Sequence, residues 1–199
     1  LRTRRQRQMC IRDRFINVCK KQGINKNDLL LTLNNLRNAR IAVIGDTIVD
    51  QYAACEPIGL SAEAPVVVVR EISIRNFVGG AAIVAKHIKS LGAKVDLLSI
   101  IGDDENATLV KEDLQLNGIK DNLIIDSSRP TTFKKRYVVE NQKLFRVSRL
   151  ESNAINSSIE NDLIKKLERI APNIDCLVIS DFVYGAVSYT HLRAHETRP

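Results

Sequence analysis

The sequence is short of the features that mark several protein classes. It has no tryptophan and only five prolines and nine glycines in 199 residues, which excludes a collagen-like or a proline- and glycine-rich disordered chain. No apolar run approaches the ~20 residues that a membrane-spanning helix needs, and no signal core follows the N-terminus. We therefore expect a cytoplasmic protein with no membrane partner. Because 44% of the residues are hydrophobic, the chain can bury a core.

The cysteines are too scattered for a disulfide framework or a zinc site. No two of them form a Cys-x-x-Cys pair, so we interpret all four as reduced thiols and predict no metal site. They are Cys10, Cys19, Cys55 and Cys176.

The net charge of +7 is concentrated at the two ends of the chain. Residues 1–14 carry six arginines against one aspartate, and residues 188–199 carry two arginines against one glutamate. The body between them is close to neutral, so no nucleic-acid partner is expected. Both ends lack a hydrophobic period and are similar to translated sequencing-adapter sequence. We interpret them as non-native ends, with basic disordered tails as the alternative, and set aside the i,i+4 pair His191 and His195.

Between the ends, short apolar strands alternate with amphipathic helices. Residues 15–38 have a helical pattern, and we interpret them as a linker or the tail of an upstream domain. Residues 39–187 are interpreted as one domain. Strands are predicted over 40–44, 64–74, 94–101, 119–125 and 176–180, helices over 80–91, 105–117 and 155–171, and a hairpin over 131–139 and 143–147. This alternation predicts an α/β fold with a Rossmann-type parallel sheet and right-handed crossovers.

Ligands of such sheets bind beyond the carboxyl ends of the strands, and three strand ends here carry acidic residues. At Asp103 and Asp104, helix capping and loop formation are the simpler interpretation. Asp50, in the segment GDTIVD, lies among apolar neighbours and is the stronger candidate ligand. Asp181 follows the last predicted strand.

A diglycine, Gly79-Gly80, opens the predicted helix over 80–91. Small residues let a ligand approach the backbone closely, and amides at a helix start suit hydroxyl or anionic groups. The segment is not a Gly-x-Gly-x-x-Gly motif, so a dinucleotide site is disfavoured. A tight strand-to-helix turn is the alternative interpretation.

The predicted hairpin separates its side chains onto two faces, because strand residues alternate with a period of two. One face carries Thr132, Lys134 and Arg136, and the other carries Phe133, Lys135 and Tyr137. Arg146, on the partner strand, is expected near the cationic face. Such a cluster fits a phosphate or carboxylate on a substrate, although a solvated polar face is the alternative.

Several segments, taken in order over residues 39–187, resemble a known family. They are IAVIGDTIVDQY, SAEAPVVVV, VGGAAIVAKHIKSLGA, GDDENATLVKEDLQLNGI, RPTTFKKRYVVENQKLFRV and LVISDFVYGA. Together they are similar to the N-terminal half of a sugar kinase of the ribokinase (PfkB) family, and within it to the heptose-phosphate kinases of ADP-heptose and lipopolysaccharide synthesis. The resemblance implies a truncated ribokinase-like sheet with a small β-lid over the sugar, a lid that is also expected to form a homodimer surface.

The resemblance also implies roles for particular residues and cofactors. Asp50 and Asp181 match acidic sugar ligands, Gly79 and Gly80 the diglycine that contacts the sugar, and Lys134, Arg136 and Arg146 the cations for a substrate phosphate. ATP and Mg²⁺ are the implied cosubstrate and cofactor. Two departures are Ile83, where asparagine is usual, and FVYG over 182–185, where Tyr-Ala-Lys-Gly is commoner.

A motif of the family is absent. Its members carry Gly-Ala-Gly-Asp, whose aspartate deprotonates the attacking hydroxyl, and this sequence has no such run. We therefore expect the chain to supply the sugar site and lid of a sugar-phosphate kinase but to be inactive by itself. A non-catalytic sugar-phosphate-binding module is the alternative. A nucleotide-binding oxidoreductase is disfavoured because the glycine fingerprint is missing.

Overall fold

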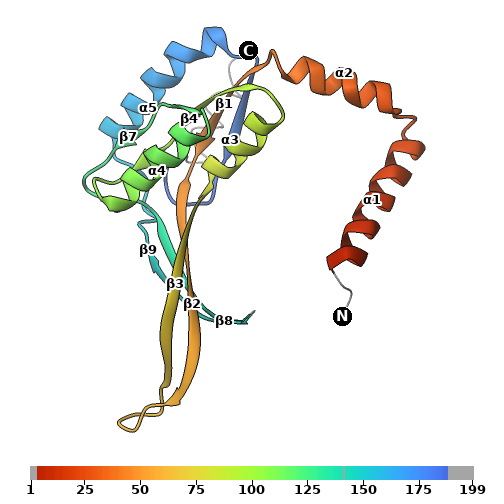
Figure 1. Cartoon of the computed structure of the whole chain (residues 1–199). Helices are drawn as coiled ribbons and strands as arrows, with labels where there is room; N and C mark the ends of the chain where they lie inside the picture. The colour runs from red at the N-terminus through yellow and green to blue at the C-terminus, as the bar shows by residue number, and fades with distance from the viewer. Residues whose placement is uncertain (1–3, 141, 188–199) are drawn as a thin grey trace.

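The computed structural model describes residues 4–140 and 142–187 (Figure 1). Its helices are α1 (Arg4–Lys21), α2 (Lys26–Leu36), α3 (Ala81–Ser90), α4 (Glu105–Leu116) and α5 (Ser157–Ile170), with a short 3-10 helix over Ala171–Asn173. Its strands are β1 (Arg40–Gly45), β2 (Thr47–Leu60), β3 (Val67–Gly80), β4 (Lys94–Leu98), β5 (Ile100–Ile101), β6 (Lys120–Asp121), β7 (Ile124–Ile125), β8 (Phe133–Val139), β9 (Gln142–Arg149) and β10 (Cys176–Ser180). Within the described ranges, no helix is long and apolar enough to cross a membrane.

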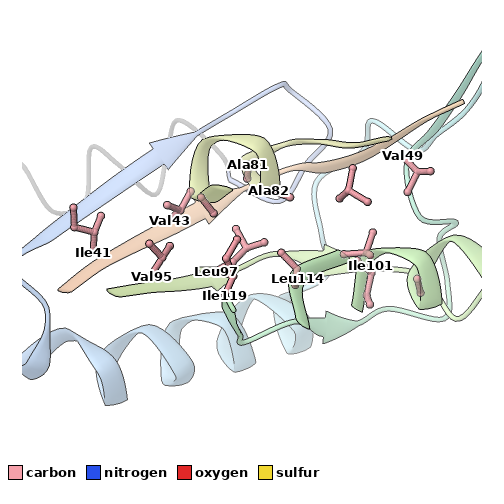
Figure 2. Close-up of a cluster of buried hydrophobic side chains, with 14 of the residues drawn as sticks. Ile41, Val43, Val49, Ala81, Ala82, Val95, Leu97, Ile101, Leu114 and Ile119 are labelled. Atoms are coloured by element: carbon pink, nitrogen blue, oxygen red, sulfur yellow. The ribbon is translucent and has the colours of Figure 1, made fainter. Parts of the chain in front are cut away.

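A parallel sheet with helices on both faces forms the body of the molecule, which confirms the predicted fold class. The strand order is β10-β1-β4-β6, and every pairing is parallel. Alternate residues of β1 point to opposite faces. Ile41 and Val43 join a cluster with α3 and α4 (Figure 2), whereas Ala42 and Ile44 pack with α5. Burial on both faces explains why β1 is an unbroken apolar run.

The second sheet is a lid that extends away from this body (Figure 1). Its order is β3-β2-β8-β9, with β2 and β8 parallel and the other pairings antiparallel. Sequence analysis did not predict β2 and placed Asp50 beyond a strand, which is wrong, because the chain breaks only at Asp46 and resumes as a strand at Thr47. The strand predicted over 64–74 is likewise too short, since β3 runs directly into α3.

The N-terminal region forms two helices separated at Gly23, as the sequence indicated for residues 15–38. Residues 4–14, which the sequence analysis interprets as part of a non-native end, lie in α1. No residue of α2 is buried, although Leu36 packs against the core. Residues 188–199, with His191 and His195, lie outside the described residues.

Candidate functional site

An open cleft of about 750 Å³ lies where the lid meets the start of α3, at the carboxyl end of β1. Its lining comes from β2, β3, α3, β8 and the segment after β10. The residues are Ile48, Asp50, Tyr52, Arg75, Phe77, Val78, Gly79, Gly80, Ile83, Lys134, Arg136 and Phe182. This end of a parallel sheet is where ligands bind in such folds, and the volume suits a small molecule.

The β2–β8 register places the polar groups of the cleft. Asp50 is aligned with Lys134, and Tyr52 with Arg136. The Arg136 guanidinium donates to the Asp50 carboxylate and lies over the Tyr52 ring, 5.3 Å from its centroid. Lys134 and Arg136 both line the cleft. The predicted separation of the hairpin side chains onto two faces is therefore confirmed for these two cations.

Lys135 points to the opposite face of the lid. Its ammonium forms an ion pair with Glu71 at 2.9 Å, and this hydrogen-bonded carboxylate raises the pKa of Lys135. It does not line the cleft. Phe133 faces the same way and packs against the core.

Lys134 is the most buried cation of the cleft, with 8% of its surface exposed. Its ammonium donates to the Tyr184 hydroxyl at 2.7 Å and lies 4.6 Å from the centroid of that ring. Tyr184 stands in the segment that departs from the family pattern, and the structure shows what it does there. Its hydroxyl is the hydrogen-bond partner of the Lys134 ammonium.

Gly79 and Gly80 are glycines for different structural reasons. Gly80 has φ +63°, and a Cβ there would lie 2.1 Å from the Asp46 carbonyl oxygen, so the turn into α3 requires glycine. A Cβ on Gly79 would lie 3.3 Å from Asp50 Oδ2. The tight-turn interpretation therefore holds for Gly80, while Gly79 leaves room around the Asp50 carboxylate. Both glycines line the cleft.

Asp46 follows β1 directly and is a buried carboxylate beside the cleft. Burial raises its pKa, although backbone amides of Phe182, Tyr184 and Ala186 donate to it and favour the charged form. Asp104 caps α4 through the Ala107 amide, as the simpler interpretation of that residue expected.

Two of the predicted ligands do not line the cleft. Arg146 is aligned with Arg136 across the hairpin, as expected, but its side chain is exposed. Asp181 is also exposed, and its carboxylate accepts a hydrogen bond from the Val183 amide at 2.7 Å. Their roles as ligands stay predictions.

Sequence reasoning missed Tyr52, Arg75 and Phe77. The signal that could have found them is the period of two in the lid strands, since Ile48, Asp50 and Tyr52 follow one another at alternate positions of β2. Arg75, Phe77 and Gly79 do the same on β3. Each triplet contributes to the cleft.

Positive charge predominates in the cleft. Lys134, Arg136 and Arg75 line it, with Asp50 as the one acidic residue among the lining residues. Within the described part of the chain, Arg75 has no ion pair with an acidic residue. Such an excess of donors suits an anionic ligand.

Two other hollows lie elsewhere on the molecule. One of about 630 Å³ lies between residues 123–125 and α5, and its polar lining is mainly surface lysine and arginine. Another of about 410 Å³ lies near Arg40 and Lys120, where β1 and β6 begin. Neither is at the carboxyl end of β1.

The fold and the cleft define an α/β protein with a cationic cleft beneath a strand lid. The chain belongs to the pfkB family of carbohydrate kinases, whose model matches residues 38–196. The family predicted from the sequence is thereby confirmed.

Individual relatives agree with this assignment. The chain is 36% identical over 155 residues to the bifunctional protein HldE of Helicobacter hepaticus, covering 76% of this chain and 32% of that protein. It is 35% identical over 158 residues to HldE of Shewanella denitrificans, covering 79% and 33%. The chain thus spans about a third of the length of these relatives.

A solved structure shows the same fold. Phosphofructokinase-2 from Escherichia coli, in complex with fructose-6-phosphate, superposes with a TM-score of 0.60 at 17% identity, covering 78% of this chain and 50% of that one. The ribokinase-like fold expected from the sequence is confirmed.

Proposed function

We propose that this chain binds a sugar phosphate as the acceptor-binding part of an ATP-dependent carbohydrate kinase. We propose a heptose 7-phosphate-like acceptor, phosphorylated in the cytoplasm for ADP-heptose and lipopolysaccharide precursor synthesis. The observation that carries the proposal is the meeting of Asp50 with Lys134 and Arg136 in one cleft. A sugar phosphate needs both kinds of group. The E. coli neighbour, which binds fructose-6-phosphate, is in keeping with this ligand class.

Each group has a distinct part in this proposal. The Asp50 carboxylate accepts hydrogen bonds from sugar hydroxyls, and Gly79 leaves space for the ring beside it. Lys134 and Arg136 donate to the phosphate, Arg136 with two parallel donors. Arg146, aligned with Arg136 on the adjacent strand, is proposed to contact the same phosphate from the solvent side. Asp181 would serve as a second hydroxyl acceptor if its carboxylate exchanged the Val183 amide for the sugar.

MgATP is the proposed phosphoryl donor of the whole protein. Within residues 4–140 and 142–187, no three His, Cys, Asp or Glu side chains gather where they could hold a metal ion. The sequence also lacks Gly-Ala-Gly-Asp. We therefore propose that this chain contributes acceptor binding, and we expect the 199-residue chain alone to transfer no phosphoryl group.

The lid surface opposite the cleft is proposed to join a second copy of the chain. Ile74, Phe145 and Val147 are about half exposed there, and Phe145 stacks on Tyr137 with ring centroids 4.6 Å apart. An exposed apolar group of this kind on a strand surface favours association. A homodimer would cover it.

The experiment is a ligand comparison by calorimetry on the 199-residue chain. A heptose 7-phosphate is expected to bind, and the same heptose without phosphate and inorganic phosphate alone are expected to bind at least tenfold more weakly, because each lacks half of the contacts. Equal affinity for the sugar with and without phosphate would contradict the proposed role of the cations.

A further inference from the structure

The segment that follows β10 forms one wall of the cleft. We call residues 181–186 the β10 loop. Phe182 lines the cleft, and the Tyr184 hydroxyl accepts a hydrogen bond from Lys134. The placement of this loop therefore decides both the shape of the cleft and the position of its most buried cation.

Asp46 binds the β10 loop through three backbone amides. Its Oδ2 accepts from the amides of Phe182 at 2.8 Å and Tyr184 at 3.2 Å, and its Oδ1 accepts from Ala186 at 3.1 Å. The Asp46 backbone carbonyl accepts from the Ala81 amide at 2.8 Å, at the start of α3. One residue thus joins two walls of the cleft, although Asp46 does not itself line it.

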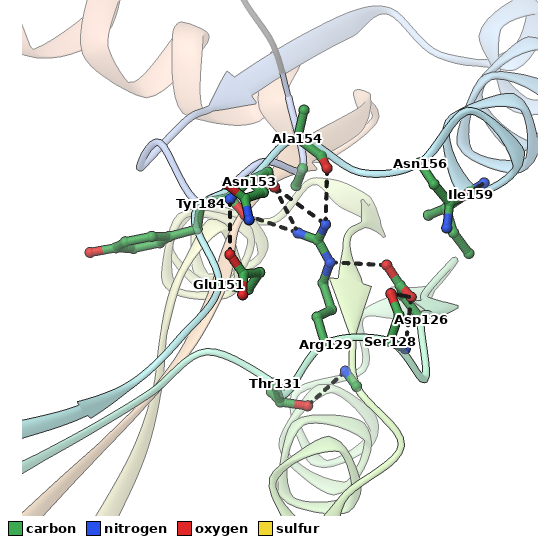
Figure 3. Close-up of polar contacts among 12 residues, drawn as sticks. Asp126, Ser128, Arg129, Thr131, Glu151, Asn153, Ala154, Asn156, Ile159 and Tyr184 are labelled. Carbon is green, nitrogen blue, oxygen red and sulfur yellow. Dashed lines mark hydrogen bonds and ion pairs between the residues drawn. The ribbon is translucent and has the colours of Figure 1, made fainter.

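Arg129 also contacts the β10 loop, at Tyr184 (Figure 3). Its guanidinium, 11% exposed, pairs with Asp126 at 2.9 Å. It also donates to the carbonyls of Tyr184 at 3.4 Å, and of Asn153 and Ala154 at 3.3 Å. Tyr184 is therefore fixed at its amide by Asp46, at its carbonyl by Arg129 and at its hydroxyl by Lys134.

The loop needs such support because its backbone is strained. Val183 has φ +63°, a left-handed conformation that a β-branched residue rarely adopts and that costs about 1–3 kcal/mol. Its side chain is 74% exposed, so packing does not hold it there. Strained conformations persist only where surrounding contacts over-determine them. Asp46 and Arg129 supply those contacts.

We propose that Asp46 and Arg129 are positioning residues, which hold the β10 loop as a preformed wall of the cleft and so fix Phe182 and Tyr184 before the ligand binds. The proposal rests on the proposed function for the identity of that ligand, a sugar phosphate. A preformed wall lowers the cost of binding because less ordering remains to be done. Neither residue lines the cleft.

Asp175 provides a control at the other end of β10. Its carboxylate also accepts a backbone amide, that of Arg40 at 2.8 Å, and it also joins β10 to β1. However, it lies before β10, at the other end of the strand from the β10 loop. Asp175→Asn removes a carboxylate charge that accepts a backbone amide beside β10 and leaves the β10 loop untouched.

The test uses fluorescence, because the natural sequence has no tryptophan. Phe182→Trp in the 199-residue chain places a single reporter in the β10 loop. In this background, Asp46→Asn and Arg129→Lys are expected to raise the quenching of Trp emission by acrylamide, and Asp175→Asn to leave it unchanged. With the reporter present, Asp46→Asn should also weaken binding of a heptose 7-phosphate by about tenfold, the effect of losing one charge-assisted contact.

The outcomes separate the inference from the proposed function. Quenching in Asp46→Asn no greater than in Asp175→Asn would overturn the positioning role. If far-ultraviolet circular dichroism shows that Asp46→Asn does not fold, Arg129→Lys decides, and unchanged quenching in that variant overturns the proposal. Quenching is measured without ligand. Failure of the parent chain to bind sugar phosphate would therefore count against the proposed function, while the loop result would still decide the inference.

Discussion

The guanidinium of Arg136 donates to the carboxylate of Asp50 across the β2–β8 pair, inside the cleft. The group proposed to bind sugar hydroxyls is thus already joined to a group proposed to bind phosphate. Both side chains are partly buried, with Asp50 25% exposed and Arg136 17% exposed. Each partner therefore neutralises a charge that would be costly to leave unpaired. In the proposed function, Asp50 accepts hydrogen bonds from the sugar hydroxyls and Arg136 donates hydrogen bonds to the phosphate. Their contact holds these two groups at a fixed separation, as binding of a sugar phosphate requires.

The two glycines of the diglycine should respond differently to alanine. Gly80→Ala is expected to lower the free energy of unfolding by about 3 kcal/mol or more, because its Cβ would clash with the Asp46 carbonyl at a left-handed backbone position. Gly79→Ala should leave stability nearly unchanged and weaken ligand binding, since its Cβ meets only the movable Asp50 carboxylate. Urea unfolding and calorimetry check this, and equal destabilisation by the two variants would contradict it.

Val183→Asn is expected to stabilise the chain by about 1 kcal/mol, because asparagine tolerates the left-handed conformation better than valine does. Thermal unfolding measures the effect. Val67→Asn is the control. Val67 is also an exposed valine and lies on β3, so this variant should be slightly less stable than the parent because asparagine disfavours strands. A lower melting temperature for Val183→Asn would show that no strain is stored there.

The stabilisation from Asp126 should depend on pH. Burial opposes its ionisation, but hydrogen bonds from Ser128 and Arg129 outweigh burial and lower its pKa below the ordinary value of 3.8. Because the folded pKa is the lower one, the stabilisation is fully present above pH 3.8 and is lost as the pH falls through the folded pKa. Asp126→Asn should therefore cost about 3 kcal/mol at pH 7 and progressively less in acid.

Urea unfolding of the parent chain and of Asp126→Asn, from pH 7 into acid, measures the difference in their free energies of unfolding. The exposed pair of Asp162 and Lys165 supplies a control, since Asp162→Asn should change stability little at any pH. A penalty for Asp126→Asn that grew toward low pH would contradict the account.

Phe145→Glu should favour the monomer, because it places a charge in the apolar surface of the lid proposed to join a second copy. Light scattering after gel filtration measures the mass. Leu116→Glu is the control, an apolar residue exposed on α4 outside the lid. If the parent chain is itself monomeric, or if the two variants change its mass equally, the lid is not the dimer surface.

The sequence predicted the elements whose signals are local. β1 and α3 are given by runs of apolar residues and a stop at Gly92, and the two faces of β8 follow from strand alternation. β2 was missed because its first residues continue the acidic turn after β1, and its strand character comes from pairing with β3 and β8.

The hydrogen bonds that hold the walls of the cleft could not be predicted from local sequence patterns. The contact of Asp46 with Phe182 joins residues 136 positions apart, and that of Lys134 with Tyr184 joins residues 50 apart. No local pattern encodes such contacts, because they arise only when β10 pairs with β1 and the lid folds over the cleft. The resemblance to the family named the candidate ligands but assigned no part to Asp46 or Arg129.

The central claim is that the cleft face of β8 holds a substrate phosphate. Calorimetric titration of the 199-residue chain with a heptose 7-phosphate, repeated for Lys134→Ala, Arg136→Ala and Lys135→Ala, tests it most directly. Loss of a charge-assisted contact of roughly 1.5–3 kcal/mol predicts affinities about ten- to a hundredfold lower for the first two variants. Lys135→Ala, which faces Glu71 on the other side of the lid, should bind as the parent does. Equal losses in all three variants, or none in any of them, would contradict the account.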